Sequence, residues 1–154
     1  MTECFEELTK RCPVTIRRRV KWGDCDPAGV VYTPRFAEYI AVDLRVFLEV
    51  LLEGPLGERC AELGFDVPAK ALSIEFKSSL RPDQVFLSTV LVGELRTRTY
   101  DLHFDARDLS GRAIYIAKFT AICVHHHVRE SRAIPAELRS RLEQYRKRND
   151  SGGS

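Results

Sequence analysis

The sequence predicts an α+β fold in which one long helix packs on a curved antiparallel sheet. Three patterns support this prediction. A strand with apolar residues at every second position spans 14–22, a strongly apolar helical segment follows at about 34–53, and a run of strands fills most of the remaining chain. A single long helix beside a run of consecutive strands indicates an α+β fold.

The composition is that of one globular domain over residues 1–154, with a core at about 14–145 and a flexible tail at 146–154. The formal net charge is only +2, so the overall charge does not indicate a nucleic-acid partner. No apolar run approaches the ~20 residues that a membrane span needs. The five cysteines include no Cys-x-x-Cys pair, and the N-terminus has no apolar signal segment. We therefore expect a cytoplasmic protein with reduced thiols.

The first predicted strand has one apolar face, formed by Val14, Ile16, Val20 and Trp22. Arg18 interrupts that face. It belongs to a basic run, 17–19, which we interpret as a solvated strand face rather than as a phosphate site. A turn-rich loop follows at 23–29.

The long helix is expected to begin after Thr33 as N-cap, with Pro34 at the first helical position. It extends to about Glu53, and Gly54 and Pro55 end it. Polar residues occupy only a narrow face, so protein should surround most of this helix. One apolar stripe is formed by Phe36, Ile40, Leu44, Phe47 and Leu51.

The rest of the chain is predicted to contain one short helix, four strands and a final helix. The short helix covers 57–64, and the strands cover 71–80, 84–95, 99–106 and 112–128. The segment 108–111 is a hairpin turn between the last two strands. Pro135 opens the final helix, which is expected to end near Tyr145.

The segment from Gly23 to Tyr32 carries the most informative motif, Asp-Pro-Ala-Gly-x-Val-Tyr, directly before a helix that begins with proline. It resembles the signature of the 4-hydroxybenzoyl-CoA thioesterase family of hotdog-fold proteins. The element order also agrees with a hotdog fold from about residue 14 to 145. The resemblance implies a long helix wrapped by a curved antiparallel sheet, and hydrolysis of an acyl thioester without a cofactor.

Thioester hydrolysis needs a nucleophile or an activated water, and hydrogen-bond donors for the developing oxyanion. The resemblance assigns the first role to Asp26, as nucleophile or as general base for water. It assigns the donor to a backbone N–H at the helix start, which by position is Thr33 or else Tyr32, and it places Gly29 in the substrate-binding loop. Without the motif, Asp26 would be interpreted as a turn carboxylate. Asp24 is expected to be structural, bonding N–H groups of the loop.

Asp43 falls within the apolar stripe of the helix, where a carboxylate is costly unless it is paired or functional. Many family members carry an acidic residue at the position that is Ala41 here, and Asp43 is a candidate replacement. It would bind a polar group of the acyl chain, or form an ion pair with Arg35 or with a partner subunit.

Two basic segments complete the set of candidate site residues. The resemblance implies that Arg98 and Thr99, supported by Arg96, hold the phosphates of coenzyme A, whereas an exposed polar bend is the alternative. The run His125–His127 is interpreted as surface or interface histidines, because alternate residues of a strand face opposite ways and only two could share a metal. No metal site is predicted.

The leading functional hypothesis is an acyl-CoA thioesterase that acts on an aromatic or other medium-sized acyl group. Release of an acyl chain from an acyl-carrier protein is the close alternative, and a non-catalytic acyl-binding hotdog module is a third. A hotdog dehydratase is disfavoured because His103 has no helix-borne partner histidine. Long edge strands argue against a monomer, and the resemblance implies a homodimer or homotetramer.

Overall fold

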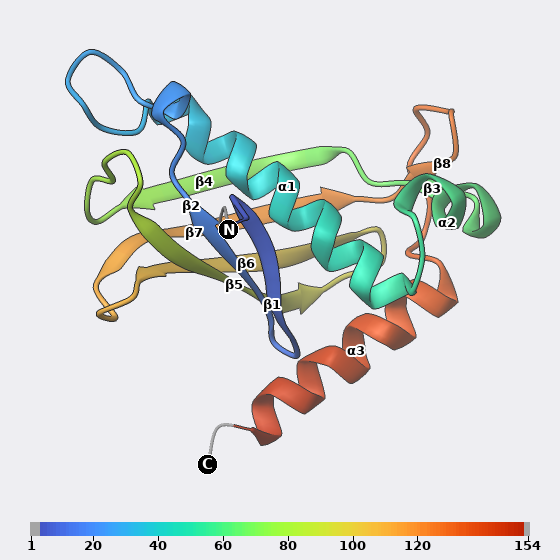
Figure 1. The fold of residues 1–154 in the computed structure, drawn as a ribbon. Helices are drawn as coiled ribbons and strands as arrows, with labels where there is room; N and C mark the ends of the chain where they lie inside the picture. The colour runs from blue at the N-terminus through green and yellow to red at the C-terminus, as the bar shows by residue number, and fades with distance from the viewer. Residues whose placement is uncertain (1–3, 153–154) are drawn as a thin grey trace.

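The computed structural model describes residues 4–152 and confirms the α+β fold. A six-stranded antiparallel sheet has the order β1-β2-β5-β6-β7-β4, and α1 (Thr33–Leu52) lies across one of its faces (Figure 1). The sheet strands are β1 (Glu6–Arg11), β2 (Val14–Arg19), β4 (Ala69–Phe76), β5 (Val85–Leu95), β6 (Thr99–Asp108) and β7 (Ala113–Ile122).

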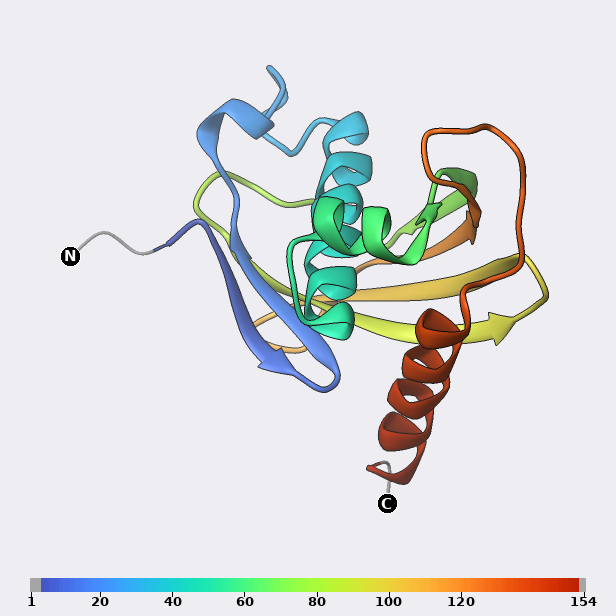
Figure 2. The same ribbon diagram turned by 90° about the vertical axis from the view of Figure 1, so that its right-hand side faces the viewer.

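The smaller elements lie around this core. A short 3-10 helix, η1 (Trp22–Asp24), opens the loop before α1. Helix α2 (Leu56–Leu63) follows α1. A separate two-stranded sheet pairs β3 (Phe65–Asp66) with β8 (Val124–His125). The last helix, α3 (Ala136–Ser151), packs against β5 and α1 (Figures 1 and 2). No helix in the described range 4–152 combines the length and the apolar character needed to cross a membrane.

Helix α1 forms where the apolar stripe predicts it, and it covers the sheet with its buried face. Thr33 is the first helical residue and Tyr32 is the N-cap, so the helix begins one position earlier than expected. Glu53 caps the other end in a left-handed conformation, with φ of 56°. The buried face consists of Phe36, Tyr39, Ile40, Asp43, Phe47, Leu48, Leu51 and Leu52.

Four sequence predictions about the elements need correction. Residues 6–11 form β1, which lies outside the predicted core and pairs with β2. The first predicted strand ends at Arg19, and Trp22 is 85% exposed rather than on the apolar face. The final strand ends at Ile122 and does not continue to 128.

The fourth correction concerns the tail. Helix α3 continues to Ser151, so residues 146–151 are helical rather than flexible, while 153–154 lie outside the described residues. The helix is anchored at Tyr145, whose hydroxyl accepts the Val14 N–H at 2.7 Å. Beyond that point Arg146 donates to the Gly93 carbonyl at 3.0 Å, and the Cys12 thiol contacts Asn149 at 3.3 Å. These contacts to the sheet extend the helix, although the segment itself is polar.

The strand register gives the sheet two distinct ends. At one end Phe76 pairs with Tyr115, and the loop at 23–32 lies nearby; we call this the loop end. At the other end Leu95 pairs with Tyr100, next to the turn at 96–98; we call this the turn end. Strand β5 has 11 residues, which separates the two ends by roughly 35 Å at the usual rise per residue.

Strand β4 is an edge strand whose only neighbour in the sheet is β7. Almost all of its residues are exposed, including Leu72 at 40% and Phe76 at 48%. An exposed edge of this length presents unpaired backbone N–H and carbonyl groups that can pair with another strand.

Candidate active site

Backbone hydrogen bonds fold the loop before α1 into a tight, ordered turn. The Asp26 N–H donates to the Val30 carbonyl, and the Gly29 N–H donates to the Asp26 carbonyl, both at 2.9 Å. Gly29 has φ of +79°, a left-handed conformation in which a side chain would be strained. The Val31 N–H donates to the Leu80 carbonyl at 2.8 Å, which fastens the loop to the sheet.

The Asp26 side chain is half-buried in this turn. One carboxylate oxygen, Oδ1, accepts the Ala28 N–H at 2.8 Å, which fixes the orientation of the carboxylate. Among the described residues, the second oxygen has no hydrogen-bond partner, and no arginine or lysine forms an ion pair with Asp26. The carboxylate is therefore oriented by the backbone but retains one oxygen for chemistry.

The two candidate oxyanion donors differ in their hydrogen bonding. The Tyr32 N–H already donates to the Asp24 carbonyl at 2.9 Å. Thr33 is the first helical residue, where N–H groups have no partner inside the helix, and within residues 4–152 we find no acceptor for it outside the helix. Pro34 has no N–H. Thr33 is therefore the donor that remains available, at the positive end of the helix dipole.

Asp24 has a different set of contacts from Asp26, two positions away. Its Oδ2 accepts the hydroxyl of Tyr39 at 2.8 Å and, more weakly, the Lys21 N–H at 3.3 Å. Burial, followed by the bond to Asp24, raises the pKa of Tyr39, so the phenol stays protonated as donor. Asp24 thus ties the loop to the second turn of α1, in agreement with a structural role.

Cys25, between the two aspartates, is not prepared to act as a nucleophile. Burial raises the pKa of its thiol, and the negative charges of Asp24 and Asp26 raise it further. A thiol with a raised pKa carries little thiolate at neutral pH.

A surface pocket of about 330 Å³ lies at the loop end, beside Thr33. Its lining combines apolar and polar side chains: Val30, Val31, Thr33, Phe36, Phe76, Lys77, Ser78 and Ser79. Asp26 is not part of the lining, although Val30 and Val31 of the same loop are. A larger groove of about 620 Å³ lies elsewhere, between β1 and the outer face of α1.

Asp43 is fully buried and forms an ion pair with Arg18 at 2.8 Å. Its partner is therefore not Arg35, which binds Glu38 instead. Burial alone would lower the pKa of Arg18, but the charge of Asp43 and the hydrogen bond to it, together with the charge of Glu6, raise this pKa above its ordinary value and keep the guanidinium protonated. Arg18 is 2% exposed, so the interpretation of 17–19 as a solvated face is wrong at this position.

The predicted phosphate-binding residues lie at the turn end, far from Asp26. Arg96 donates to Asp101 at 2.8 and 3.1 Å and to Glu94 at 2.9 Å, so carboxylates already neutralise it. Thr99 is nearly buried and accepts from Arg96 at 3.3 Å. Arg98 is different, because it donates to Ser131 at 2.9 Å and forms no ion pair among the described residues. Of the three, only Arg98 is available to an anion.

Sequence reasoning missed three features around the loop and helix α1. It did not identify Tyr39 as the anchor of the loop, although a tyrosine on the buried face of a helix commonly needs a partner for its hydroxyl. It also missed the polar run 77–79 in the pocket wall and the pairing of Arg18 with Asp43. Two opposite charges on two predicted apolar faces were the available signal for that pair.

The comparison with known families identifies the chain. The family model of the thioesterase-like superfamily matches residues 20–142, and the protein belongs to that superfamily. The match confirms the resemblance derived from the motif, and with it the hotdog fold. No curated protein is similar enough in sequence to match.

Solved structures with the same fold include several thioesterases. A 1,4-dihydroxy-2-naphthoyl-CoA thioesterase from Synechocystis is 19% identical, with a TM-score of 0.74 over 83% of this chain and 93% of that one. A gentisyl-coenzyme A thioesterase is 22% identical, with a TM-score of 0.74 over 83% and 98%. A 4-hydroxybenzoyl-CoA thioesterase variant in complex with 4-hydroxybenzoyl-CoA is 20% identical, with a TM-score of 0.74 over 83% and 96%.

Proposed function

We propose that this protein hydrolyses an acyl-CoA thioester to the free acid and the thiol, with Asp26 as the catalytic carboxylate. The observation that carries the proposal is that one ordered loop and the helix start beside it present two polar groups without partners. Within residues 4–152, Asp26 keeps one oxygen without a partner, and the Thr33 N–H at the start of α1 has no acceptor. Membership of the thioesterase-like superfamily supports the same chemistry.

In this mechanism the thioester carbonyl oxygen accepts the Thr33 N–H, and the helix dipole stabilises the charge that develops on it. The Asp26 carboxylate either attacks the carbonyl carbon, which releases the thiolate and leaves a mixed anhydride for water to cleave, or removes a proton from an attacking water. Gly29 lets the loop backbone approach the substrate without a side chain. The two routes share the same residues.

We propose an aromatic acyl group as the preferred substrate. The pocket beside Thr33 is lined by Phe36 and Phe76, whose rings lie 5.2 Å apart in an edge-on arrangement. Aromatic side chains favour contact with another ring. The three thioesterases of similar fold act on aromatic acyl-CoA esters according to their names.

We propose that the site is completed by a second copy of the chain, paired along the exposed edge of β4. Strands that pair antiparallel across a two-fold axis place opposite ends side by side. The turn end of one copy, with Arg98, would then lie beside the loop end of the other, with Asp26. This arrangement places Arg98 of one copy where it can bind the nucleotide of a coenzyme A held at Asp26 of the other copy. Within one copy, Arg98 and Asp26 lie too far apart for this, because roughly 35 Å of sheet separates the two ends.

A panel of acyl-CoA esters tests the proposed activity. We expect turnover of benzoyl-CoA, hydroxybenzoyl-CoA and phenylacetyl-CoA, with kcat/KM higher than for linear acyl-CoAs of similar size. Salt-sensitive activity on acyl-carrier proteins, with little on the CoA esters, would favour the carrier-protein alternative. Absence of hydrolysis across the panel would favour a non-catalytic acyl-binding module.

Light scattering tests the proposed assembly separately. We expect a dimer or a tetramer of the 17.6 kDa chain at micromolar concentration, whereas a monomer would contradict a shared site.

We further propose that this assembly works in the reducing cytoplasm, since all five cysteines are free thiols. Mass spectrometry of the protein from cells should find them unpaired.

A further inference from the structure

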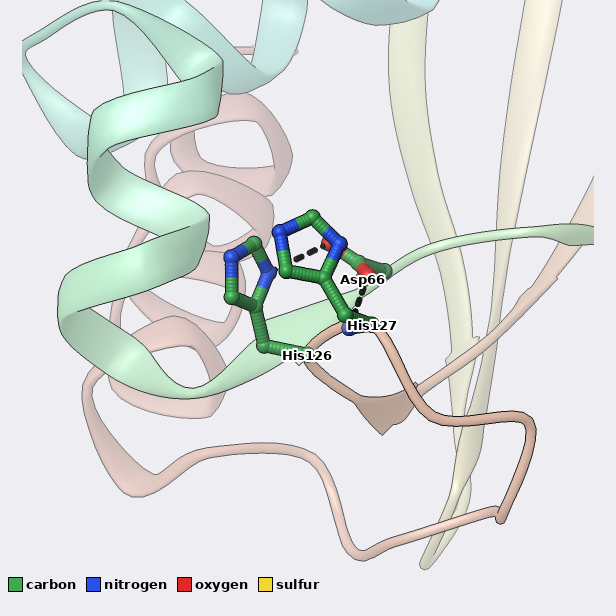
Figure 3. Close-up of side chains that lie close together, drawn as sticks. All are labelled: Asp66, His126 and His127. Carbon is green, nitrogen blue, oxygen red and sulfur yellow. Dashed lines mark hydrogen bonds and ion pairs between the residues drawn. The ribbon is translucent and has the colours of Figure 1, made fainter.

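Three side chains that the proposed thioesterase site does not use gather at the turn end of the molecule. Asp66 comes from β3, and His126 and His127 come from the turn after β8 (Figure 3). Their potential ligand atoms all lie within 4.8 Å of one another. His125, the first histidine of the run, remains in β8 and is exposed.

The backbone determines this arrangement. Strand β8 ends at His125, and the Val128 N–H closes a turn on the His125 carbonyl at 3.0 Å. His127 has φ of +60°, an uncommon conformation for a residue with a side chain. As a result His126 and His127 do not alternate between two faces, and their rings lie 3.7 Å apart at an angle of 40°.

The carboxylate of Asp66 is oriented toward both histidines. One oxygen lies 2.9 Å from His126 Nδ1, and the other accepts the backbone N–H of His127 at 2.9 Å. Figure 3 shows both rings on the side of this carboxylate.

We propose that Asp66, His126 and His127 form a binding site for a divalent transition-metal ion, with Zn²⁺ as the preferred ion. Two imidazoles and one carboxylate are a common ligand set for zinc, with a further position open to water. Small rotations of the two rings would bring the ligand atoms to the ~2.0–2.2 Å that zinc bonds require. Mg²⁺ and Ca²⁺, which prefer oxygen ligands, suit this set less well.

A metal at this position would join two segments that are far apart in the sequence. Asp66 belongs to the short sheet after α2, and the two histidines belong to the segment that leads to α3. Because β3 and β8 have only two residues each, their pairing alone is weak, and bound metal would stabilise the folded state.

Calorimetric titration of the metal-free full chain with Zn²⁺ tests the site. We expect one ion per chain with a micromolar Kd and a rise in melting temperature on binding. Asp66→Asn is the sharpest variant, because the amide oxygen still accepts the His127 N–H while the anionic ligand is lost. It should weaken binding by about tenfold or more, as should His126→Ala.

His125→Ala is the matched control, since it removes an adjacent exposed histidine that is outside the cluster. Its Kd should stay within about twofold of the wild-type value by ordinary surface-mutation standards. Cys4→Ala, which removes the exposed thiol, should also bind normally. The proposed ligand set is wrong if Asp66→Asn binds Zn²⁺ as tightly as the wild type. It is also wrong if His125→Ala weakens binding as much as Asp66→Asn does. The readout does not depend on thioesterase turnover.

Discussion

The two ends of the sheet differ in how fully their charged groups are bonded. At the loop end, one carboxylate oxygen of Asp26 accepts the Ala28 N–H, and the other has no partner among the described residues. At the turn end, Arg96 is bonded to Asp101, Glu94 and Thr99. Both ends are polar, yet only the loop end leaves reactive groups available next to a helix N-terminus. At the turn end, Arg96, Asp101, Glu94 and Thr99 form a network of hydrogen bonds and ion pairs that, among the described residues, does not include Arg98. The comparison indicates that a candidate functional residue is recognised by the hydrogen-bonding groups that it leaves unsatisfied as well as by its residue type.

The largest expected effect is at Asp26. Asp26→Asn keeps the shape and the bond to the Ala28 N–H but removes the charge that we propose attacks the thioester or activates water. We expect kcat to fall by a factor on the order of 10² or more. Saturating kinetics with an aromatic acyl-CoA measure this effect, with circular dichroism as the control for folding.

Asp24→Asn is the matched control for this variant. Its amide oxygen can still accept the Tyr39 hydroxyl, which lies 2.8 Å from the native carboxylate. We therefore expect nearly normal kcat and a somewhat lower melting temperature. If Asp26→Asn keeps the wild-type kcat while Asp24→Asn loses it, the two assignments must be exchanged. If neither matters, Asp43 is the next carboxylate to test.

A smaller effect is expected from the ion-pair network at the turn end. The bonds from Arg96, against the effect of burial, lower the pKa of Asp101 to about 2, from the ordinary aspartate value of 3.8. A carboxylate whose pKa is lower in the folded state stabilises the protein above its unfolded pKa, and this stability is lost as the pH falls through the folded pKa. Its contribution is therefore complete near neutral pH and declines between about pH 4 and 2.

Asp101→Asn should accordingly reduce the free energy of unfolding by about 1–2 kcal/mol at pH 7. Urea denaturation at pH 7, 5 and 3 measures the difference between the wild type and the variant, which should narrow at pH 3. A difference that is constant across this range would show that the ionised state of Asp101 does not stabilise the fold.

The smallest effect is expected at Arg98. Arg98→Ala should raise KM for acyl-CoA by about five- to tenfold with little change in kcat, because a phosphate contact binds the ground and transition states alike. A substrate truncated to the pantetheine arm lacks the nucleotide and should be insensitive to the substitution. Equal sensitivity to both substrates would show that Arg98 does not contact the nucleotide.

The sequence predicted the elements whose pattern is local, but it could not predict those that depend on distant partners. The long helix, the strands β5 and β6 and the loop motif follow from periodicity and from Gly29 and Pro34. Helix α3 beyond Tyr145 has little apolar character, and its order depends on contacts such as Arg146 to the sheet. The extra strand β1 likewise depends on pairing with β2 rather than on a pattern of its own.

The candidate site divides in the same way. Asp26 and Thr33 could be assigned from the motif, because the loop and the helix start are adjacent in the sequence. The partner of Asp43 could not be assigned from the sequence. Arg18 lies on strand β2, and only the packing of α1 on the sheet brings the two side chains together. The approach of Asp66 to His126 was missed for a similar reason, because it depends on where β8 ends.

The most direct test of the account uses mixed assemblies of two defective copies. Asp26→Asn and Arg98→Ala chains are unfolded together, refolded, and assayed at an acyl-CoA concentration well below the raised KM. If the two ends meet only across copies, the site that combines the intact Asp26 of one chain with the intact Arg98 of the other behaves as the wild type. Random pairing should then restore about a quarter of the wild-type sites. Activity no higher than the average of the two parent variants would contradict a site shared between two copies.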